Sequence, residues 1–377
     1  MPIAVEKSSK PASPNVRRRW LKRLAFVAYL LVLCEVAVRG YWTIRHGVPF
    51  FDMRQIFVGR FYPELRESGV LTANVSREDE TLDVLILGGS VVTPAFGNIG
   101  DLLQQQLPAA AGRPVRVYKC ANLALNSLDS VWKYERLRDQ RFDLVLVYES
   151  INEARLNNCP PEFFRDDYEH MSWYRRVAAL DRHPELPYFV LPYSLEYLAV
   201  GLFDHPAIGW YLPRHFPAHS EWPRQHGAEV KTAGSYQRNL ERIIALACQR
   251  GATVCLPQYA YHIPDDATLE RYQREQLGHW ANGRMIEGWG TAEGVTASID
   301  AHNAIIRELV AAHPHVVSVD MNGLLPHDGT VFNDPCHLSA RGCELFVEHL
   351  IAPLAEWSAG PEVAKLPRTN DSPIRRQ

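Results

Sequence analysis

The sequence lacks a strong excess of charge of either sign. It contains 40 lysine and arginine residues against 43 aspartate and glutamate residues, so its formal net charge is only -3. A protein that binds nucleic acid usually carries a basic surface that neutralises phosphates. We therefore expect no nucleic acid partner.

The sequence also lacks the common metal and cofactor signatures. None of the spacings between its seven cysteines resembles a zinc site. The turn Gly88-Gly89-Ser90 is followed by neither the later glycine of a dinucleotide-binding motif nor the lysine of a P-loop. Val92 stands where a Gly-x-Ser-x-Gly elbow needs its last glycine. We expect no metal and no cofactor, and the cysteines form either disulfides or buried free thiols.

No apolar run reaches the ~20 residues that a membrane-spanning helix usually needs. Residues 24–38 come nearest, although Glu35 interrupts them. Seven lysines and arginines precede this stretch, and Trp20, Tyr41 and Trp42 flank it, as is typical of membrane interfaces.

This pattern predicts a disordered cytoplasmic tail over residues 1–19 and a retained single-pass signal-anchor in the cytoplasmic membrane over residues 20–42. The N-terminus would lie inside, and the catalytic domain would be periplasmic or extracellular. The alternative is a buried first helix of a soluble protein.

From Leu82 onward, short apolar runs alternate with helical stretches, which predicts an α/β fold. We expect a flavodoxin-like three-layer sandwich with a parallel five-stranded sheet, in a domain over residues 43–357 that precedes a disordered tail over residues 358–377. The expected strands are 84–87, 115–118, 144–148, 253–256 and 316–320, and the expected helices are 99–107, 130–140, 236–250, 297–312 and 340–355.

Two segments, residues 160–232 and 259–292, do not fit the alternation. Both follow the carboxyl ends of predicted strands, where open α/β sheets bind their ligands, so we expect insertions that wall or cover a site. Their tryptophans either stack on sugar rings or pack in the protein interior; they are Trp173, Trp210, Trp222, Trp280 and Trp289.

Four polar motifs also fall at the predicted strand ends. Ser90 directly follows the first strand, and Asp334 and His337 lie three residues apart on the loop before the last helix. A carboxylate that orients an imidazole, which in turn takes the proton of a serine, is the arrangement needed for nucleophilic catalysis. Ser127 and Asn152 follow the second and third strands, where a backbone N–H and a side-chain amide could stabilise an oxyanion.

In this order, the four motifs resemble those of the SGNH (GDSL-type) hydrolase family, in its membrane-anchored bacterial form. The resemblance covers residues 83–350 without the two insertions. It implies that Ser90 is the nucleophile, that Asp334 and His337 are the acid and base, and that the oxyanion hole consists of Ser90, Ser127 and Asn152.

The sequence departs from the family pattern at four positions. Gly89 replaces the usual aspartate before the nucleophile, and Glu153 stands where aspartate often follows the asparagine. Ser127 and Ser150 replace glycines, and Ser127 matters most, because a side chain restricts a turn that requires positive φ.

The resemblance implies a serine esterase that hydrolyses acyl esters, acetyl esters above all, outside the cytoplasmic membrane. An acylated carbohydrate or another ester would be the substrate, and partners in the envelope or in polysaccharide export are left open. Two alternatives remain: an O-acyltransferase that modifies an exported polysaccharide, and a catalytically silent binding or assembly module that keeps the SGNH fold.

Overall fold

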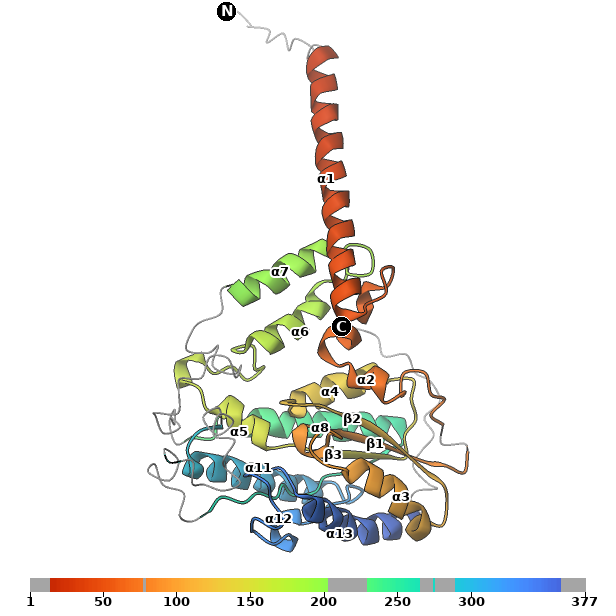
Figure 1. The fold of residues 1–377 in the computed structure, drawn as a ribbon, viewed down its shortest axis with the longest axis vertical. Helices are drawn as coiled ribbons and strands as arrows, with labels where there is room; N and C mark the ends of the chain where they lie inside the picture. The colour runs from red at the N-terminus through yellow and green to blue at the C-terminus, as the bar shows by residue number, and fades with distance from the viewer. Residues whose placement is uncertain (1–13, 77–78, 203–228, 265–273, 275–288, 361–377) are drawn as a thin grey trace, which may run out of the picture. The chain divides into compact units, whose positions relative to one another are not determined.

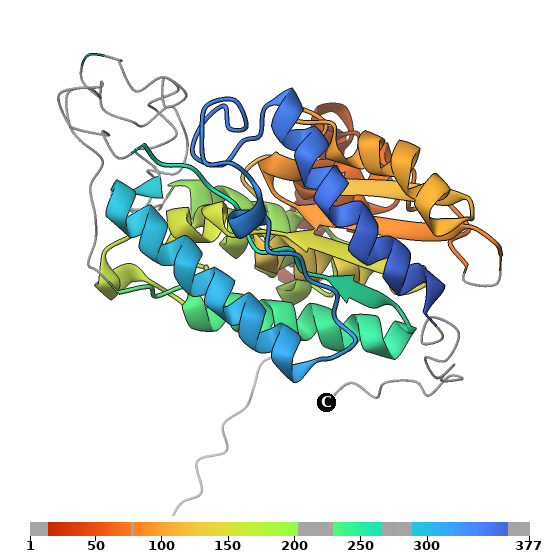
Figure 2. The same cartoon turned by 90° about the horizontal axis from the view of Figure 1, so that it is seen from below.

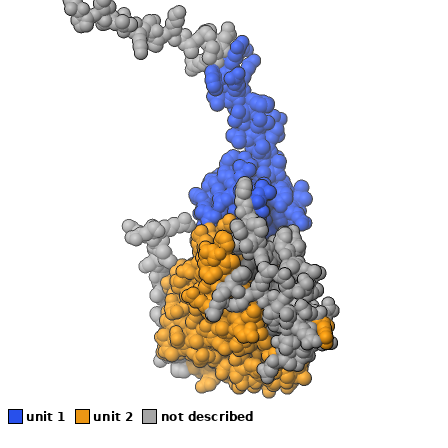
Figure 3. Space-filling view, turned by 90° about the vertical axis from the view of Figure 1, so that its left-hand side faces the viewer, with its two compact units in different colours: residues 1–61, 176–203 blue, residues 62–175, 204–377 orange. Residues whose placement is uncertain are grey.

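The computed structural model describes residues 14–76, 79–202, 229–264, 274 and 289–360 (Figure 1). The chain divides into two compact units. One comprises residues 1–61 and 176–203, and the other comprises residues 62–175 and 204–377 (Figure 3).

The larger unit is built on a parallel sheet of four strands in the order β2-β1-β3-β4. Every residue of β1, β3 and β4 is buried, which explains their unbroken apolar runs. In the register, Gly88 pairs with both Ala121 and Tyr148, so the first three strands end at the same level. The loops that follow them therefore meet at one edge of the sheet. The strands are β1 (Leu82–Gly88), β2 (Val115–Ala121), β3 (Leu144–Tyr148) and β4 (Thr253–Cys255).

Helices cover both faces of this sheet (Figures 1 and 2). On one face α3 (Ile99–Ala111) packs against α13 (Ala340–Ala359), and on the other α4 (Ser127–Arg136) packs against α8 (Ala233–Arg250). Helix α11 (Ala292–Ala312) lies beside α8 and α5. The shorter helical elements of the unit are α2 (Glu64–Glu67), η3 (Ser90–Val92), α5 (Ile151–Asn157), η4 (Pro161–Phe163) and α12 (Met321–Leu324).

The predicted three-layer α/β fold with a parallel sheet is confirmed, but the prediction of five strands is wrong. Residues 316–320 do run alongside β4, where the Val317 N–H donates to Val254 O at 2.9 Å and the Leu256 N–H donates to Val317 O at 2.9 Å. They make only one parallel bridge, between Cys255 and Val317. The segment is cut short because Asp320 already caps α12.

The smaller unit holds α1 (Pro14–His46), η1 (Met53–Gln55), η2 (Phe57–Phe61), most of α6 (Ser172–Arg182) and α7 (Leu191–Leu202). The Glu35 carboxylate accepts hydrogen bonds from the backbone N–H groups of Val190 (2.9 Å) and Leu191 (3.0 Å), at the start of α7. Trp42 is buried in this unit and donates to Ser194 Oγ at 2.9 Å.

No helix in the described part of the chain is long and apolar enough to cross a membrane. The signal-anchor over residues 20–42 stays a prediction. Two charged residues lie in or directly after the apolar stretch. Glu35 and Arg39, one helical turn apart, form an ion pair at 2.7 Å. Helix α1 also begins at Pro14, inside the predicted tail, whereas residues 1–13 and 361–377 lie outside the described residues.

The structure describes the predicted insertions in part and all seven cysteines. The first insertion supplies all of α6 and α7, while Trp210, Trp222 and Trp280 fall outside the described residues. All seven cysteines are free, and Cys34 and Cys248 are exposed. The cysteines are therefore free thiols and form no disulfides.

Candidate active site

Ser90 is the first residue of the short helix η3, directly after β1. The two residues before it must be glycines, because a Cβ at either position would clash with neighbouring atoms. A Cβ on Gly88 would lie 2.9 Å from Tyr148 O, and a Cβ on Gly89 would lie 2.6 Å from Asn152 Nδ2 and 2.9 Å from Leu125 O. Gly89 has a φ of -87°, so its backbone needs no left-handed conformation. An aspartate at position 89 would find no room here.

The structure brings Ser90, His337 and Asp334 together in one line of hydrogen bonds. Ser90 Oγ lies 2.7 Å from His337 Nε2, and His337 Nδ1 lies 2.5 Å from Asp334 Oδ2. With the ring proton on Nδ1, Nε2 is the acceptor that faces the serine hydroxyl. All three residues are buried.

The loop before α13 holds the carboxylate of Asp334. Asp334 Oδ1 accepts the backbone N–H groups of His337 at 2.8 Å and Cys336 at 3.0 Å, which leaves Oδ2 for the imidazole. Burial alone would raise the pKa of Asp334, but the hydrogen bonds from His337 and Cys336 outweigh it and hold the pKa below its usual value. Asp334 is therefore a carboxylate at neutral pH.

Aromatic rings surround the imidazole of His337. Phe96 stacks on it with ring centroids 4.2 Å apart and planes 18° apart, and Trp289 lies at 6.5 Å. Trp289 is buried in the core, while Phe96 remains 37% exposed. Phe96 thus covers one face of the imidazole, a contact that the sequence analysis missed.

One group of side chains in the described part of the chain could supply three metal ligands: Asp334, Cys336 and His337, whose ligand atoms lie within 4.8 Å of one another. Two of them already bond each other through Asp334 Oδ2 and His337 Nδ1. Burial raises the pKa of the Cys336 thiol well above its usual value, so the thiol stays protonated and is a poor ligand at neutral pH.

Asn152 lies beside the nucleophile turn, on the first turn of α5. Its Nδ2 donates to Leu125 O at 2.6 Å, in the loop between β2 and α4. This contact uses one of the two amide hydrogens and fixes the plane of the amide.

Ser127 is placed differently from its predicted role in the oxyanion hole. It opens α4 with an ordinary φ, so the feared restriction on its turn does not arise. However, its backbone N–H donates to Glu153 Oε1 at 2.6 Å, and its Oγ accepts from Asn239 Nδ2 at 2.9 Å. In this structure the Ser127 N–H therefore donates to the side chain of Glu153 and is not available to an oxyanion.

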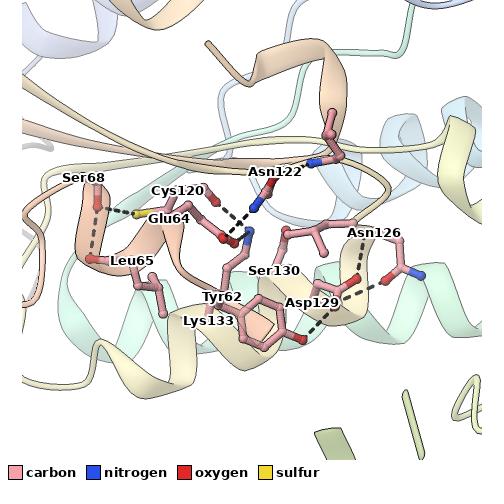
Figure 4. Close-up of polar contacts among 12 residues, drawn as sticks. Tyr62, Glu64, Leu65, Ser68, Cys120, Asn122, Asn126, Asp129, Ser130 and Lys133 are labelled. Atoms are coloured by element: carbon pink, nitrogen blue, oxygen red, sulfur yellow. Dashed lines mark hydrogen bonds and ion pairs between the residues drawn. The ribbon is translucent and has the colours of Figure 1, made fainter. Parts of the chain in front are cut away.

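The residue with the unusual backbone in this loop is Ala124, whose φ is +61°. Such a conformation is rare for a residue with a Cβ. The loop continues into α4 through a capping box, in which the Asn126 side chain accepts from the backbone of Asp129, and Asp129 Oδ2 accepts the Asn126 N–H (Figure 4). Tyr62 donates to Asp129 Oδ1 at 2.7 Å in the same network (Figure 4).

Two further acids, Glu149 and Glu153, are buried at the end of β3 and in α5. Burial and the neighbouring Glu153 raise the pKa of Glu149 well above its usual value. Burial likewise raises the pKa of Glu153, to about 7. Glu149 accepts from Ser130 Oγ at 2.9 Å. Sequence reasoning noted Glu153 only as a departure from the family pattern, and it did not foresee this pair.

Ser150 and the tryptophan Trp173 have structural partners. Ser150 Oγ lies 2.9 Å from Nδ1 of the buried His302, whose Nε2 lies 3.1 Å from Thr232 Oγ1. The hydroxyl that replaces a family glycine thus joins α5 to α11. Trp173 donates to Asp129 Oδ1 at 3.1 Å, so it packs inside the larger unit.

No protein-family model and no curated protein matches the chain. Solved structures that are similar to it include LAE5, an α/β hydrolase from the metagenome of Lake Arreo, Spain, which is 13% identical, with 76% of this chain and 99% of that chain covered and a TM-score of 0.40.

Two others are a GDSL-like lipase from Bacteroides thetaiotaomicron (12% identical, 78% and 97% covered, TM-score 0.39) and Axe2, an acetylxylan esterase from Geobacillus stearothermophilus (12% identical, 74% and 95% covered, TM-score 0.37). The solved structures that the chain is similar to thus include hydrolases and esterases, one of them GDSL-like.

Proposed function

We propose that the chain is a serine esterase of the SGNH type that hydrolyses acyl esters, with acetyl esters of carbohydrates as its substrate class. The observation that carries the proposal is the line from Ser90 Oγ through His337 to Asp334, with contacts of 2.7 Å and 2.5 Å. The location of the enzyme outside the cytoplasmic membrane stays a prediction.

In the first step, Ser90 Oγ bonds to the ester carbonyl carbon as its proton passes to His337 Nε2. Asp334 stabilises the imidazolium through Nδ1–H. The carbon–oxygen bond to the alcohol then breaks, and His337 returns the proton to the leaving oxygen. A water molecule repeats the sequence on the acyl-enzyme and releases the acid and Ser90.

We assign the oxyanion to two donors. As the first residue of η3, Ser90 has a backbone N–H without a partner inside that helix, and Asn152 has a second amide hydrogen beyond the one given to Leu125. Because Glu153 holds the Ser127 N–H, we assign the hole to Ser90 and Asn152 alone.

The test is to react the purified full-length chain with a fluorophosphonate probe and to measure hydrolysis of p-nitrophenyl acetate and acetylated xylan. Ser90→Ala and His337→Ala should lose both activities, while the matched controls Ser358→Ala and His349→Ala, on α13, should keep them.

Labelling of the wild type without hydrolysis, together with acetyl transfer to an added sugar, would replace the esterase with an O-acyltransferase. A folded wild type that neither labels nor hydrolyses would favour a silent binding module, a reading that agrees with the loss of Ser127 as a donor.

A further inference from the structure

Side chains of α5 bind the loop between β2 and α4 at three points. Arg155 donates to Ala124 O at 2.9 Å, Asn152 Nδ2 donates to Leu125 O at 2.6 Å, and Glu153 Oε1 accepts the Ser127 N–H at 2.6 Å. Three side chains from four consecutive residues of one helix thus bind residues 124–127. We call these contacts the α5 clamp.

The loop held by the clamp needs such support. Ala124 has a φ of +61°, a strained conformation for alanine, and its carbonyl is the acceptor for Arg155. On the side of α4, the capping box of Asn126 and Asp129 fixes the same segment (Figure 4). The loop is therefore held from two helices, and Leu125 O, which orients the Asn152 amide, lies between the points of attachment.

The choice of a carboxylate at position 153 also requires a reason. Glu153 is buried, and Oε2 has no hydrogen-bond partner in the described part of the chain. Burial of a carboxylate costs free energy that a neutral glutamine would avoid. When it is ionised, however, a carboxylate forms a stronger bond with a backbone N–H, especially at the N-terminus of a helix such as α4. With a pKa of about 7, Glu153 is partly ionised at neutral pH.

We propose that Glu153 and Arg155 are positioning residues, which hold residues 124–127 so that Leu125 O fixes the Asn152 amide as an oxyanion donor beside Ser90. The proposal rests on the esterase function proposed above. It assigns the two residues a role through Asn152 and not through contact with the substrate. A displacement of the amide would weaken a bond made only in the transition state, so it would lower kcat and leave KM nearly unchanged.

A double-mutant cycle tests this role in the full-length chain with p-nitrophenyl acetate. We expect Glu153→Ala and Arg155→Ala each to lower kcat by about tenfold to a hundredfold, below the 10²–10³ typical of losing an oxyanion donor. In an Asn152→Ala background the same changes should cost less than about threefold. Equal losses in both backgrounds would show that the two residues act independently of Asn152, and this result would overturn the proposal.

Conservative variants and controls sharpen the result. Glu153→Gln keeps an acceptor and should retain more activity than Glu153→Ala. Glu135→Gln and Arg242→Ala remove an exposed ion pair of 2.9 Å between α4 and α8, and they should change neither kcat nor KM. Thermal unfolding confirms that each variant is folded.

Amide hydrogen exchange separates failure of the clamp from failure of the esterase. Exchange at residues 125–128 should accelerate in Glu153→Ala and Arg155→Ala, and stay unchanged in the two controls, whether or not the chain hydrolyses esters. Unchanged exchange in the clamp variants would overturn the clamp. An inert wild type with accelerated exchange in these variants would refute the esterase and with it the catalytic purpose of the clamp, leaving only a structural hold on the loop.

Discussion

Replacing Asp334 by asparagine should abolish nearly all esterase activity while leaving the fold intact. Oδ1 of Asp334 accepts two backbone N–H groups, at 2.8 Å and 3.0 Å, so an asparagine must place its carbonyl oxygen there. Its NH2 group then faces His337 Nδ1, which must become the acceptor. The ring proton moves to Nε2, and Nε2 can no longer take the proton of Ser90.

The size of this effect follows from the wrong tautomer. In serine proteases the corresponding change lowers kcat by about 10⁴, which is ~5.4 kcal/mol of transition-state stabilisation at 1.36 kcal/mol per tenfold. We expect a comparable loss in kcat for p-nitrophenyl acetate and a similar loss in the rate of fluorophosphonate labelling. KM should change little, because Asp334 does not contact the ester.

The control is Asp328→Asn, which alters an exposed carboxylate on the same loop, bonded to the Thr330 backbone N–H at 2.7 Å. It should keep wild-type kinetics. If Asp334→Asn retained more than about a tenth of the wild-type kcat and remained folded, the tautomer argument would be refuted. Nitrogen NMR of the His337 ring, which reports which nitrogen carries the proton, checks the cause directly.

Three further changes test other parts of the site. Asn152→Ala should lower kcat on p-nitrophenyl acetate by about 10²–10³ with little change in KM, because it removes one oxyanion donor; a loss below about threefold would exclude that role. Gly89→Ala should cost about 1–3 kcal/mol of unfolding free energy in a urea titration, since its Cβ would lie 2.6 Å from Asn152 Nδ2; wild-type stability would contradict the close packing. Burial lowers the pKa of His302 to about 3 from 6.5, so the unfolded chain binds more protons and the wild type loses stability as the pH falls through this range. His302→Gln should lessen that loss, as measured by urea unfolding near pH 7 and pH 4, and an unchanged pH dependence would argue against a buried neutral imidazole.

The line of Ser90, His337 and Asp334 was predictable from the sequence for a physical reason. In a parallel sheet the carboxyl ends of the strands meet at one edge, so polar residues that follow different strands come together there. The register bears this out, since Gly88 pairs with both Ala121 and Tyr148. The spacing of three residues between Asp334 and His337 then allows one loop to supply both side chains.

The occupation of the Ser127 N–H was not predictable in the same way. The pattern placed Ser127 at a strand end, and it identified the concern as the Cβ of a serine in a glycine position. The actual limit comes from Glu153, whose side chain reaches across from α5. Such a contact depends on how α4 and α5 pack together, and the position of Ser127 in the sequence does not predict this packing. One indication of this contact was present in the sequence: Glu153 directly follows Asn152, which was itself predicted to lie near Ser127.

The N-terminal segment shows which contacts a local pattern indicates and which it does not. A basic flank, an apolar stretch and interfacial aromatics all favoured a signal-anchor. The spacing of Glu35 and Arg39, four residues apart, was an equally local signal, because such pairs bond on a helix surface. Glu35 also accepts the backbone N–H groups of Val190 and Leu191, about 155 residues away, and no periodicity in the sequence indicates a contact of that range.

The choice between an esterase and a silent module depends on the free energy of folding that is lost when three polar side chains are buried in a line. Ser90, Asp334 and His337 are all buried, and buried polar groups destabilise a fold unless they are bonded. A binding module would gain stability from apolar residues at these positions, since replacement of a buried ion pair by well-packed apolar residues is often neutral or stabilising. A hydroxyl, an imidazole and a carboxylate aligned at 2.7 Å and 2.5 Å are instead the groups that acyl transfer requires.

Hydrolysis and transfer share this line of residues, because His337 must take a proton from whichever hydroxyl attacks the acyl-enzyme. The specificity for water or sugar must therefore arise from groups outside the triad. Phe96, which stacks on the imidazole and is 37% exposed, is one such group.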